Sequence, residues 1–294
     1  MIDEFRSKLT ASYGEREVTQ FIFLLFEEYL HWTRIQTMNS YETILTEAQT
    51  HLFQNSLLEL ENAKPIQYII GKTWFNGNEI SLNEKVLIPR PETEELCILI
   101  KKDHIHRQFQ EFSILDIGTG SGNIAIDLKL QFRYASITAI DVSIESIAVA
   151  GFNAEKHGCD IHFRQMDILD PFGDSENEKF DLIVSNPPYV LESERKFMKR
   201  NVTDYEPEPA LFVPDEDPLL FYKAISAYAF RNLERPGNLY FEINENFGEA
   251  IRSMLLLTGF ERVEICKDLH GKDRFVKAEL RRFLHDTSYW YADK

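Results

Sequence analysis

Residues 113–126 read Ser113-Ile114-Leu115-Asp116-Ile117-Gly118-Thr119-Gly120-Ser121-Gly122-Asn123-Ile124-Ala125-Ile126. The order of an apolar run, a glycine-rich turn and a second apolar run predicts a buried strand, a tight turn and the start of a helix. Glycines in such a turn allow positive φ angles and a close approach of the backbone to a ligand. The spacing is GxGxG, whereas the dinucleotide fingerprint GxGxxG would need glycine or alanine at Asn123. This favours a ligand without a pyrophosphate, with a purely structural turn as the alternative.

Short apolar runs alternate with amphipathic segments from Phe112 onward, which predicts a parallel β-sheet with helices on both faces. We expect its strands at residues 113–117, 136–140, 160–165, 180–185 and 238–243. Two further strands, 260–266 and 274–280, are joined by a loop too short for a parallel crossover, so they form an antiparallel pair. This Rossmann-like α/β architecture, mostly parallel with a C-terminal antiparallel strand, is typical of class I S-adenosylmethionine-dependent methyltransferases. NAD-binding relatives normally finish with parallel strands.

The chain before this region predicts two further segments. Residues 1–62 contain no proline and repeat apolar side chains at three- and four-residue intervals, which predicts a small helical domain. Within it, Asn39 and Glu42 fit a capping box at the start of a new helix. Residues 63–91 change to period two and predict a linker hairpin around Asn76-Gly77, followed by a short strand at 86–88. The main domain is expected at 92–294, with its first helix beginning near Pro91.

The composition is that of a soluble globular protein, with 44% hydrophobic and 27% charged residues and no stretch long enough to span a membrane. The N-terminus lacks the features of a secretory signal, so we expect a cytoplasmic protein. A net charge of −16 repels phosphate backbones, so we expect no direct nucleic-acid binding. The basic stretch 195–200 has a solvated helical face as its simplest interpretation. The three cysteines lie far apart in the sequence, which predicts free thiols and no metal site. They are Cys97, Cys159 and Cys266.

Carboxylates follow the expected strands at the sheet edge where open α/β sheets bind ligands. Asp141 ends the second strand, where it can accept hydrogen bonds from both hydroxyls of an adenosine ribose, although a helix N-cap is the alternative. Asp167 follows the third strand and could accept from the adenine amine while Ile168 covers the ring. Together with the glycine-rich turn, these residues predict an S-adenosylmethionine site. Its candidates are Asp116, Gly118, Thr119, Gly120, Ser121, Gly122, Asp141, Asp167, Ile168 and Asn186.

The fourth strand leads into Asn186-Pro187-Pro188-Tyr189, which predicts an acceptor site at the same edge. The prolines fix φ and remove backbone donors, so the carbonyls of Asn186 and Pro187 are held stiffly. An amide or aromatic amine nitrogen must partly lose its conjugation when it attacks a methyl sulfonium. If the Asn186 side-chain oxygen and the Pro187 carbonyl each accept one N–H, they orient the lone pair and stabilise the developing charge. We expect no general base and no metal, with Tyr189 stacked on a planar acceptor.

Three further stretches make the sequence resemble the PrmC/HemK methyltransferases, from Pro65 onward and more loosely before it. They are Pro65-Ile66-Gln67-Tyr68-Ile69-Ile70-Gly71, Val86-Leu87-Ile88-Pro89-Arg90-Pro91-Glu92-Thr93-Glu94 and Tyr205-Glu206-Pro207-Glu208-Pro209-Ala210-Leu211. The Asn-Pro-Pro-Tyr motif alone is shared with nucleic-acid methyltransferases. The sequence departs from the family where members often have an aromatic residue at Ile168, glycine at Pro218 and Glu-Ile-Gly at 242–244.

The resemblance implies transfer of a methyl group from S-adenosylmethionine to the glutamine amide of the Gly-Gly-Gln motif in class I peptide chain release factors. It places the catalytic residues at Asn186, Pro187 and Tyr189, and the substrate contacts at Asn186, Pro187, Pro188, Tyr189, Arg90 and Glu92. It also assigns the N-terminal domain to docking of the release factor. A nucleic-acid enzyme acting on adenine N6 or guanine N2, a ribosomal-protein glutamine methyltransferase, and a non-catalytic or NAD-binding protein remain as alternatives.

Overall fold

The structure is a computed structural model and describes residues 1–39, 44–170 and 178–281 of the 294-residue chain. At its centre lies a seven-stranded sheet of order β10-β11-β9-β6-β3-β4-β5. Five neighbouring strands from β5 to β9 are parallel, whereas β11 runs antiparallel to both β9 and β10. The bounds are β3 Ser113–Ile117, β4 Ser136–Asp141, β5 His162–Gln165, β6 Phe180–Ser185, β9 Leu233–Glu242, β10 Glu261–Lys267 and β11 Asp273–Leu280. The predicted parallel sheet with its C-terminal antiparallel strand is confirmed.

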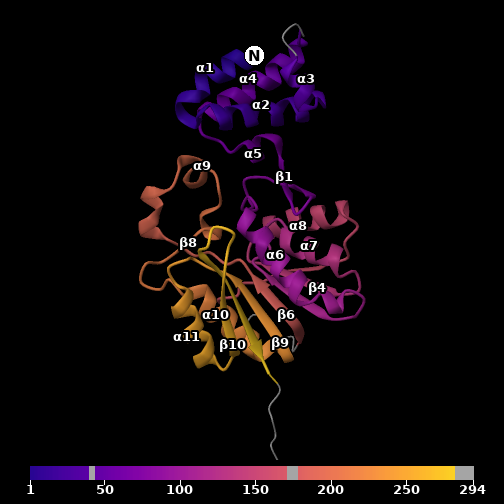
Figure 1. The fold of residues 1–294 in the computed structure, drawn as a ribbon, viewed down its shortest axis with the longest axis vertical. Helices are drawn as coiled ribbons and strands as arrows, with labels where there is room; N and C mark the ends of the chain where they lie inside the picture. Colours follow the sequence, from indigo (N-terminus) through magenta and orange to yellow (C-terminus); the bar gives the residue numbers. More distant parts are fainter. Residues whose placement is uncertain (40–43, 171–177, 282–294) are drawn as a thin grey trace, which may run out of the picture.

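Helices cover both faces of this sheet (Figure 1). On one face α6 (Pro91–Asp103), α7 (Asn123–Gln131) and α8 (Ile144–Lys156) pack in a core with inward side chains such as Ile114 and Val184. On the other face α10 (Leu220–Asn232) and α11 (Gly248–Thr258) pack against Leu115 and Ile183. Neighbouring residues of one strand thus enter opposite cores. This explains why the central strands are continuous apolar runs rather than alternating patterns.

The N-terminal helices form a separate apolar core above the sheet (Figure 1). They are α1 Ile2–Tyr13, α2 Glu15–Leu30, α3 Arg34–Met38 and α4 Glu47–Glu61. The helix start predicted at Asn39 includes Glu42, which lies outside the described residues. The capping boxes in the structure begin α3 at Thr33 and α4 at Thr46. Each satisfies orphan amides at a helix N-terminus and so marks where the chain reverses direction.

The segment between the helices and the sheet contains the predicted hairpin, with β1 (Lys72–Phe75) and β2 (Asn78–Ser81) joined at Asn76-Gly77. It also contains a short helix, α5 (Ile66–Ile70), that the period-two interpretation missed. The predicted strand at 86–88 is wrong: Val86 and Ile88 are buried but pair with no strand. Buried apolar side chains therefore produced a strand-like pattern in an irregular segment.

A long connection after β6 carries only short elements. They are β7 Val190–Leu191, η2 Glu192–Phe197, α9 Arg200–Thr203, η3 Glu208–Ala210 and β8 Phe212–Val213, while η1 (Ile105–Arg107) follows α6. The connection reaches the N-terminal helices, because the Tyr205 hydroxyl donates to the carbonyl of Asn62 at 3.0 Å. No helix in the described ranges is long and apolar enough to cross a membrane.

Candidate active site

The glycine-rich turn and the Asn-Pro-Pro-Tyr tetrapeptide lie side by side at the carboxyl edge of the sheet. They follow the neighbouring parallel strands β3 and β6, which pair from Ile114 to Ile117. The Ser185 hydroxyl donates to the carbonyl of Ile117 at 2.8 Å and so joins the two strand ends. A Cβ built on Gly118 would lie 4.0 Å from the main-chain oxygen of Asn186. The structure thus brings the predicted cofactor turn and the predicted acceptor residues together.

The turn from Gly118 to Gly122 has the backbone that its glycines predict. Gly118, Gly120 and Gly122 have φ values of 73°, 54° and 81°, which residues with a Cβ rarely adopt. Around Gly120 a Cβ would meet no atom within 4 Å, so this part of the turn faces open space. At Gly122 a Cβ would lie 3.0 Å from that of Ala150, so this glycine lets α7 and α8 pack closely. The predicted glycines therefore have two different roles.

Asp141 holds this turn in place from the neighbouring strand β4. Its Oδ2 accepts from the Gly120 amide and its Oδ1 from the Ser143 amide, both at 2.9 Å. The capping alternative for Asp141 is wrong, because the side chain that caps α8 is that of Ser143. Asp167 and Ile168 follow β5 at the same edge, where Asp167 is exposed and Ile168 is half-buried. The three residues therefore line one edge, as the sequence predicted.

Asp116 is the next-to-last residue of β3 and its carboxyl group is fully buried. Its Oδ2 accepts from the Thr119 hydroxyl at 2.7 Å. Burial raises the pKa of Asp116 from 3.8 to about 7, and the bond from Thr119 opposes this rise. A backbone hydrogen bond from Ala125 also lowers this pKa, so the carboxyl group links the end of β3 to the turn and to the start of α7.

This raised pKa makes a prediction for stability without cofactor. Since the folded pKa lies above the unfolded one, the folded protein retains the proton longer and loses stability from this group as pH rises from about 4 to about 7. Asp116→Asn removes the titration. The free energy of unfolding of this variant minus that of the wild type should therefore be larger at about pH 8 than at about pH 5. The increase should be roughly 2 to 3 kcal/mol. Denaturant titrations at the two pH values measure this difference, and an equal difference at both would contradict the buried charge.

The side chains of the tetrapeptide are tied to residues far away in the sequence. The Asn186 Nδ2 donates to the Thr93 hydroxyl at 3.0 Å, and the Tyr189 hydroxyl donates to Oε1 of Glu242 at 3.0 Å. The Asn244 Nδ2 donates to the main-chain oxygen of Tyr189 at 3.3 Å. The departure from Glu-Ile-Gly at Asn244 therefore adds a contact to the tetrapeptide. Sequence reasoning assigned no role to Thr93 or Glu242, although Thr93 stands in the stretch 86–94 and Glu242 begins the triad 242–244.

Arg90 and Glu206 join two of the quoted stretches. The Arg90 Nη2 lies 2.6 Å from Oε1 of Glu206, whose side chain is 1% exposed. The other oxygen of Glu206 accepts from the Ile88 amide at 3.3 Å. Glu92 lies in the first turn of α6; burial raises the pKa of Glu242, and the charge of Glu92 adds a smaller rise. The two motifs therefore meet in one ion pair, which spacing alone could not reveal.

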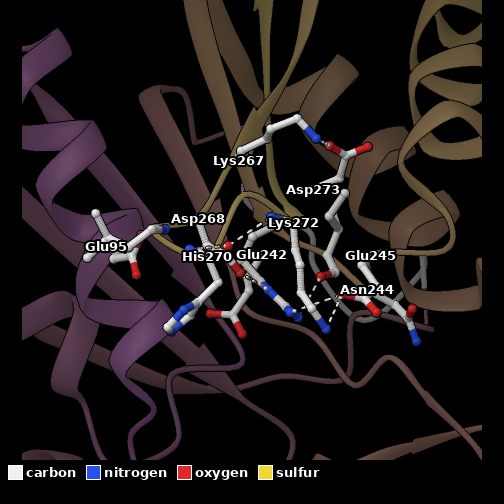
Figure 2. Close-up of polar contacts among 12 residues, drawn as sticks. Glu95, Glu242, Asn244, Glu245, Lys267, Asp268, His270, Lys272 and Asp273 are labelled. Carbon is white, nitrogen blue, oxygen red and sulfur yellow. Dashed lines mark hydrogen bonds and ion pairs between the residues drawn. The ribbon is translucent and has the colours of Figure 1, made fainter.

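The loop between β10 and β11, residues 268–272, lies at the same edge and was not predicted to be part of the site (Figure 2). Asp268 closes it by accepting from the amides of His270 and Lys272. The Leu269 amide donates to Glu95 of α6 at 3.0 Å, and Lys272 pairs with Glu245 at 2.8 Å. These bonds fix the loop between α6 and the end of β9, next to Glu242.

Comparison with known proteins identifies the family. Residues 1–71 match the PrmC N-terminal domain and residues 108–246 match a methyltransferase domain. A release factor glutamine methyltransferase of Flavobacterium psychrophilum is 42% identical over 95% of this chain and 97% of its own. The protein of that name in Bacteroides thetaiotaomicron is 40% identical over 93% and 96%. The chain belongs to the release factor glutamine methyltransferase family. This confirms the resemblance found in the sequence.

Solved structures agree on the fold. A methyltransferase from Pyrococcus furiosus superposes with a TM-score of 0.51 at 18% identity, covering 81% of this chain and all of the other. A Thermus thermophilus 16S rRNA methyltransferase gives 0.51 at 16% identity, covering 72% of this chain and 50% of the other. At these identities the likeness concerns the fold alone. The family member therefore has the class I methyltransferase fold with an additional helical N-terminal region.

Proposed function

We propose that this protein transfers a methyl group from S-adenosylmethionine to the side-chain amide nitrogen of the glutamine in the Gly-Gly-Gln motif of class I release factors. The observation that carries the proposal is the placement of Asn186 beside the glycine-rich turn, in a chain 42% identical to a named family member along nearly its full length. A donor site and an acceptor for amide N–H groups are thus adjacent.

The residues at the sheet edge fit S-adenosylmethionine, which supplies an activated methyl group when bound. The open side of the turn at Gly120 leaves room for a ligand close to the backbone. Asp141, held by two amides, is oriented to accept from the ribose hydroxyls, while Asp167 and Ile168 would recognise and cover the adenine. Asp116 supports this turn from below the surface by accepting from the Thr119 hydroxyl.

The acceptor glutamine is oriented in the proposed reaction by oxygen atoms of Asn186 and Pro187. An amide is too weak an acid for a carboxylate to deprotonate in advance, so the site needs orientation rather than a base. The two oxygens would accept the amide's N–H bonds, turn its lone pair toward the methyl group and stabilise the positive charge that develops. Pro188 stiffens the segment, and the Tyr189 ring would select a planar group.

The N-terminal helices are proposed to dock the release factor. Ile35, Met38 and Leu52 are large apolar residues that are exposed on α3 and α4, and they are the candidates for contact with the release factor in this proposal. We propose domain limits at 1–62, 63–91 and 92–294. A release factor acts in the cytosol, so its modifying enzyme would act there too.

A nucleic-acid substrate is less well supported. The arginines of the basic stretch 195–200 are paired locally, Arg195 with Glu192 and Glu208, and Arg200 with Asp204. They therefore offer little free charge to phosphates, and the net charge of −16 opposes such binding.

Labelled S-adenosylmethionine offered with purified release factor, ribosomal proteins or DNA tests the proposed substrate. We expect label in the release factor and none in a variant whose Gly-Gly-Gln glutamine is replaced. Label in DNA or ribosomal protein but not in the release factor would contradict the proposal.

A further inference from the structure

Two buried polar side chains bond the tetrapeptide and come from segments far apart in the sequence. Thr93 is in the first turn of α6 and is 2% exposed, while Glu242 is the last residue of β9 and is fully buried. The Thr93 hydroxyl donates to Oε2 of Glu242 at 2.6 Å. Buried polar groups are costly unless paired, so this contact between distant segments needs an explanation beyond packing.

The direction of these hydrogen bonds follows from the protons available. An ionised carboxylate can only accept, so the single hydroxyl proton of Thr93 points to Glu242. The Thr93 oxygen is then an acceptor toward Asn186, whose Nδ2 lies 3.0 Å away. If the Asn186 carboxamide were rotated by a half turn, its Oδ1 would face the Thr93 oxygen, and two acceptors would be in contact. The chain of bonds therefore directs Oδ1 of Asn186 away from Thr93.

Glu242 binds the other end of the tetrapeptide as well. Its Oε1 accepts from the Tyr189 hydroxyl at 3.0 Å, while its Oε2 reaches Asn186 only through the Thr93 hydroxyl. Burial raises the pKa of Glu242, while the bonds from Thr93 and Tyr189 and the charge of Arg274 lower it. In the ionised form both oxygens can accept, as the bonds from Thr93 and Tyr189 need, whereas a protonated oxygen would donate to one of these partners instead.

We infer that Thr93 and Glu242 are positioning residues that hold the Asn186 carboxamide with its oxygen toward the acceptor nitrogen, and that fix the Tyr189 ring beside it. This inference rests on the proposed function, in which that oxygen accepts an N–H of the substrate. Neither residue touches the substrate. Their effect on the reaction passes through Asn186 and Tyr189.

Thr93→Val tests the inference, since valine keeps the shape of threonine and removes the hydroxyl. We expect kcat for release-factor methylation to fall about tenfold or more, with KM and the Kd for S-adenosylmethionine within about threefold of wild type. Thr93→Ser, which keeps the hydroxyl, should return kcat to within about threefold. Ser226→Ala is the matched control, because it removes a buried hydroxyl that donates to the Tyr222 carbonyl of its own helix, and kcat should stay unchanged.

A double mutant distinguishes a role of Thr93 in positioning Asn186 from a role in the stability of the fold alone. If Thr93 acts through Asn186, Thr93→Val should lower kcat no further in an Asn186→Ala background. An equal loss in both backgrounds, or a kcat within about twofold of wild type for Thr93→Val, would overturn the inference. Should Thr93→Val fail to fold, Glu242→Gln keeps the size of the side chain but supplies a donor, and it should give the same fall in kcat with unchanged cofactor affinity.

The orientation of the Asn186 carboxamide can also be measured without substrate, so the inference can be tested separately from the proposed function. If the wild-type enzyme methylates no release factor, the proposed function fails and NMR of the Asn186 side-chain amide still decides the orientation. Its protons should exchange slowly in wild type and in Thr93→Ser, and rapidly in Thr93→Val. Identical exchange in all three would overturn the inference.

Discussion

Asn186→Ala is expected to lower the turnover of release-factor methylation by roughly a hundredfold or more. The substitution removes one of two oxygens that would stabilise the charge developing on the amide nitrogen, and loss of one such group typically costs about 3 kcal/mol of transition-state stabilisation. Steady-state rates with saturating release factor and labelled S-adenosylmethionine measure the effect. The substitution also removes the hydrogen bond that the Asn186 side chain donates to Thr93. The loss of this bond should leave the fold intact.

Cofactor affinity is the internal control for this variant. The Kd for S-adenosylmethionine, measured by calorimetry, should stay within about tenfold of wild type, because Asp141 and the glycine-rich turn are unchanged. A turnover close to that of wild type would show that Asn186 does not orient the acceptor. A large loss of cofactor affinity would instead assign Asn186 to the donor site.

Arg90→Ala is expected to lower the free energy of unfolding by about 3 to 4 kcal/mol. Removal of the guanidinium leaves the carboxylate of Glu206 buried without its cation, and an uncompensated buried charge is strongly destabilising. The same change should lower activity, since the pair joins the segment before α6 to the connection after β6. Denaturant unfolding measures the loss of stability.

Exposed ion pairs supply the control for Arg90. Arg200 pairs with Asp204, but 74% of its side chain is exposed, so Arg200→Ala should cost less than about 1 kcal/mol. In Arg90→Ala/Glu206→Ala the carboxylate is gone as well, and the combined loss should be smaller than the sum of the single losses. Additive losses would show that the two side chains do not stabilise one another.

Local patterns predicted most of the main domain because each was decided by neighbouring residues. The run from Ser113 to Gly122 specifies a buried strand and a turn with positive φ, and both are found. The segment at 86–88 shows the limit of such patterns, since buried apolar residues there lie in an irregular chain. Helix α5 was missed because five residues offer too little periodicity.

The site was predicted where it lies at strand ends and missed where it depends on side chains from remote segments. Asn186 and Asp141 follow parallel strands, whose carboxyl ends must meet at one edge. The partners of Asn186 and Tyr189, namely Thr93 and Glu242, are separated by 149 residues and are brought together only by the packing of α6 on the sheet. No spacing rule in a single sequence reports such a contact.

The position of the transferred methyl group tests the account most directly. Release factor treated with this enzyme and S-adenosylmethionine is digested, and tandem mass spectrometry locates the added mass. We predict one methyl group on the side-chain amide of the Gly-Gly-Gln glutamine, formed at a rate roughly a hundredfold or more lower with Asn186→Ala under the same conditions. A methyl group on any other residue, or an unmodified glutamine after treatment with active enzyme, would contradict the account.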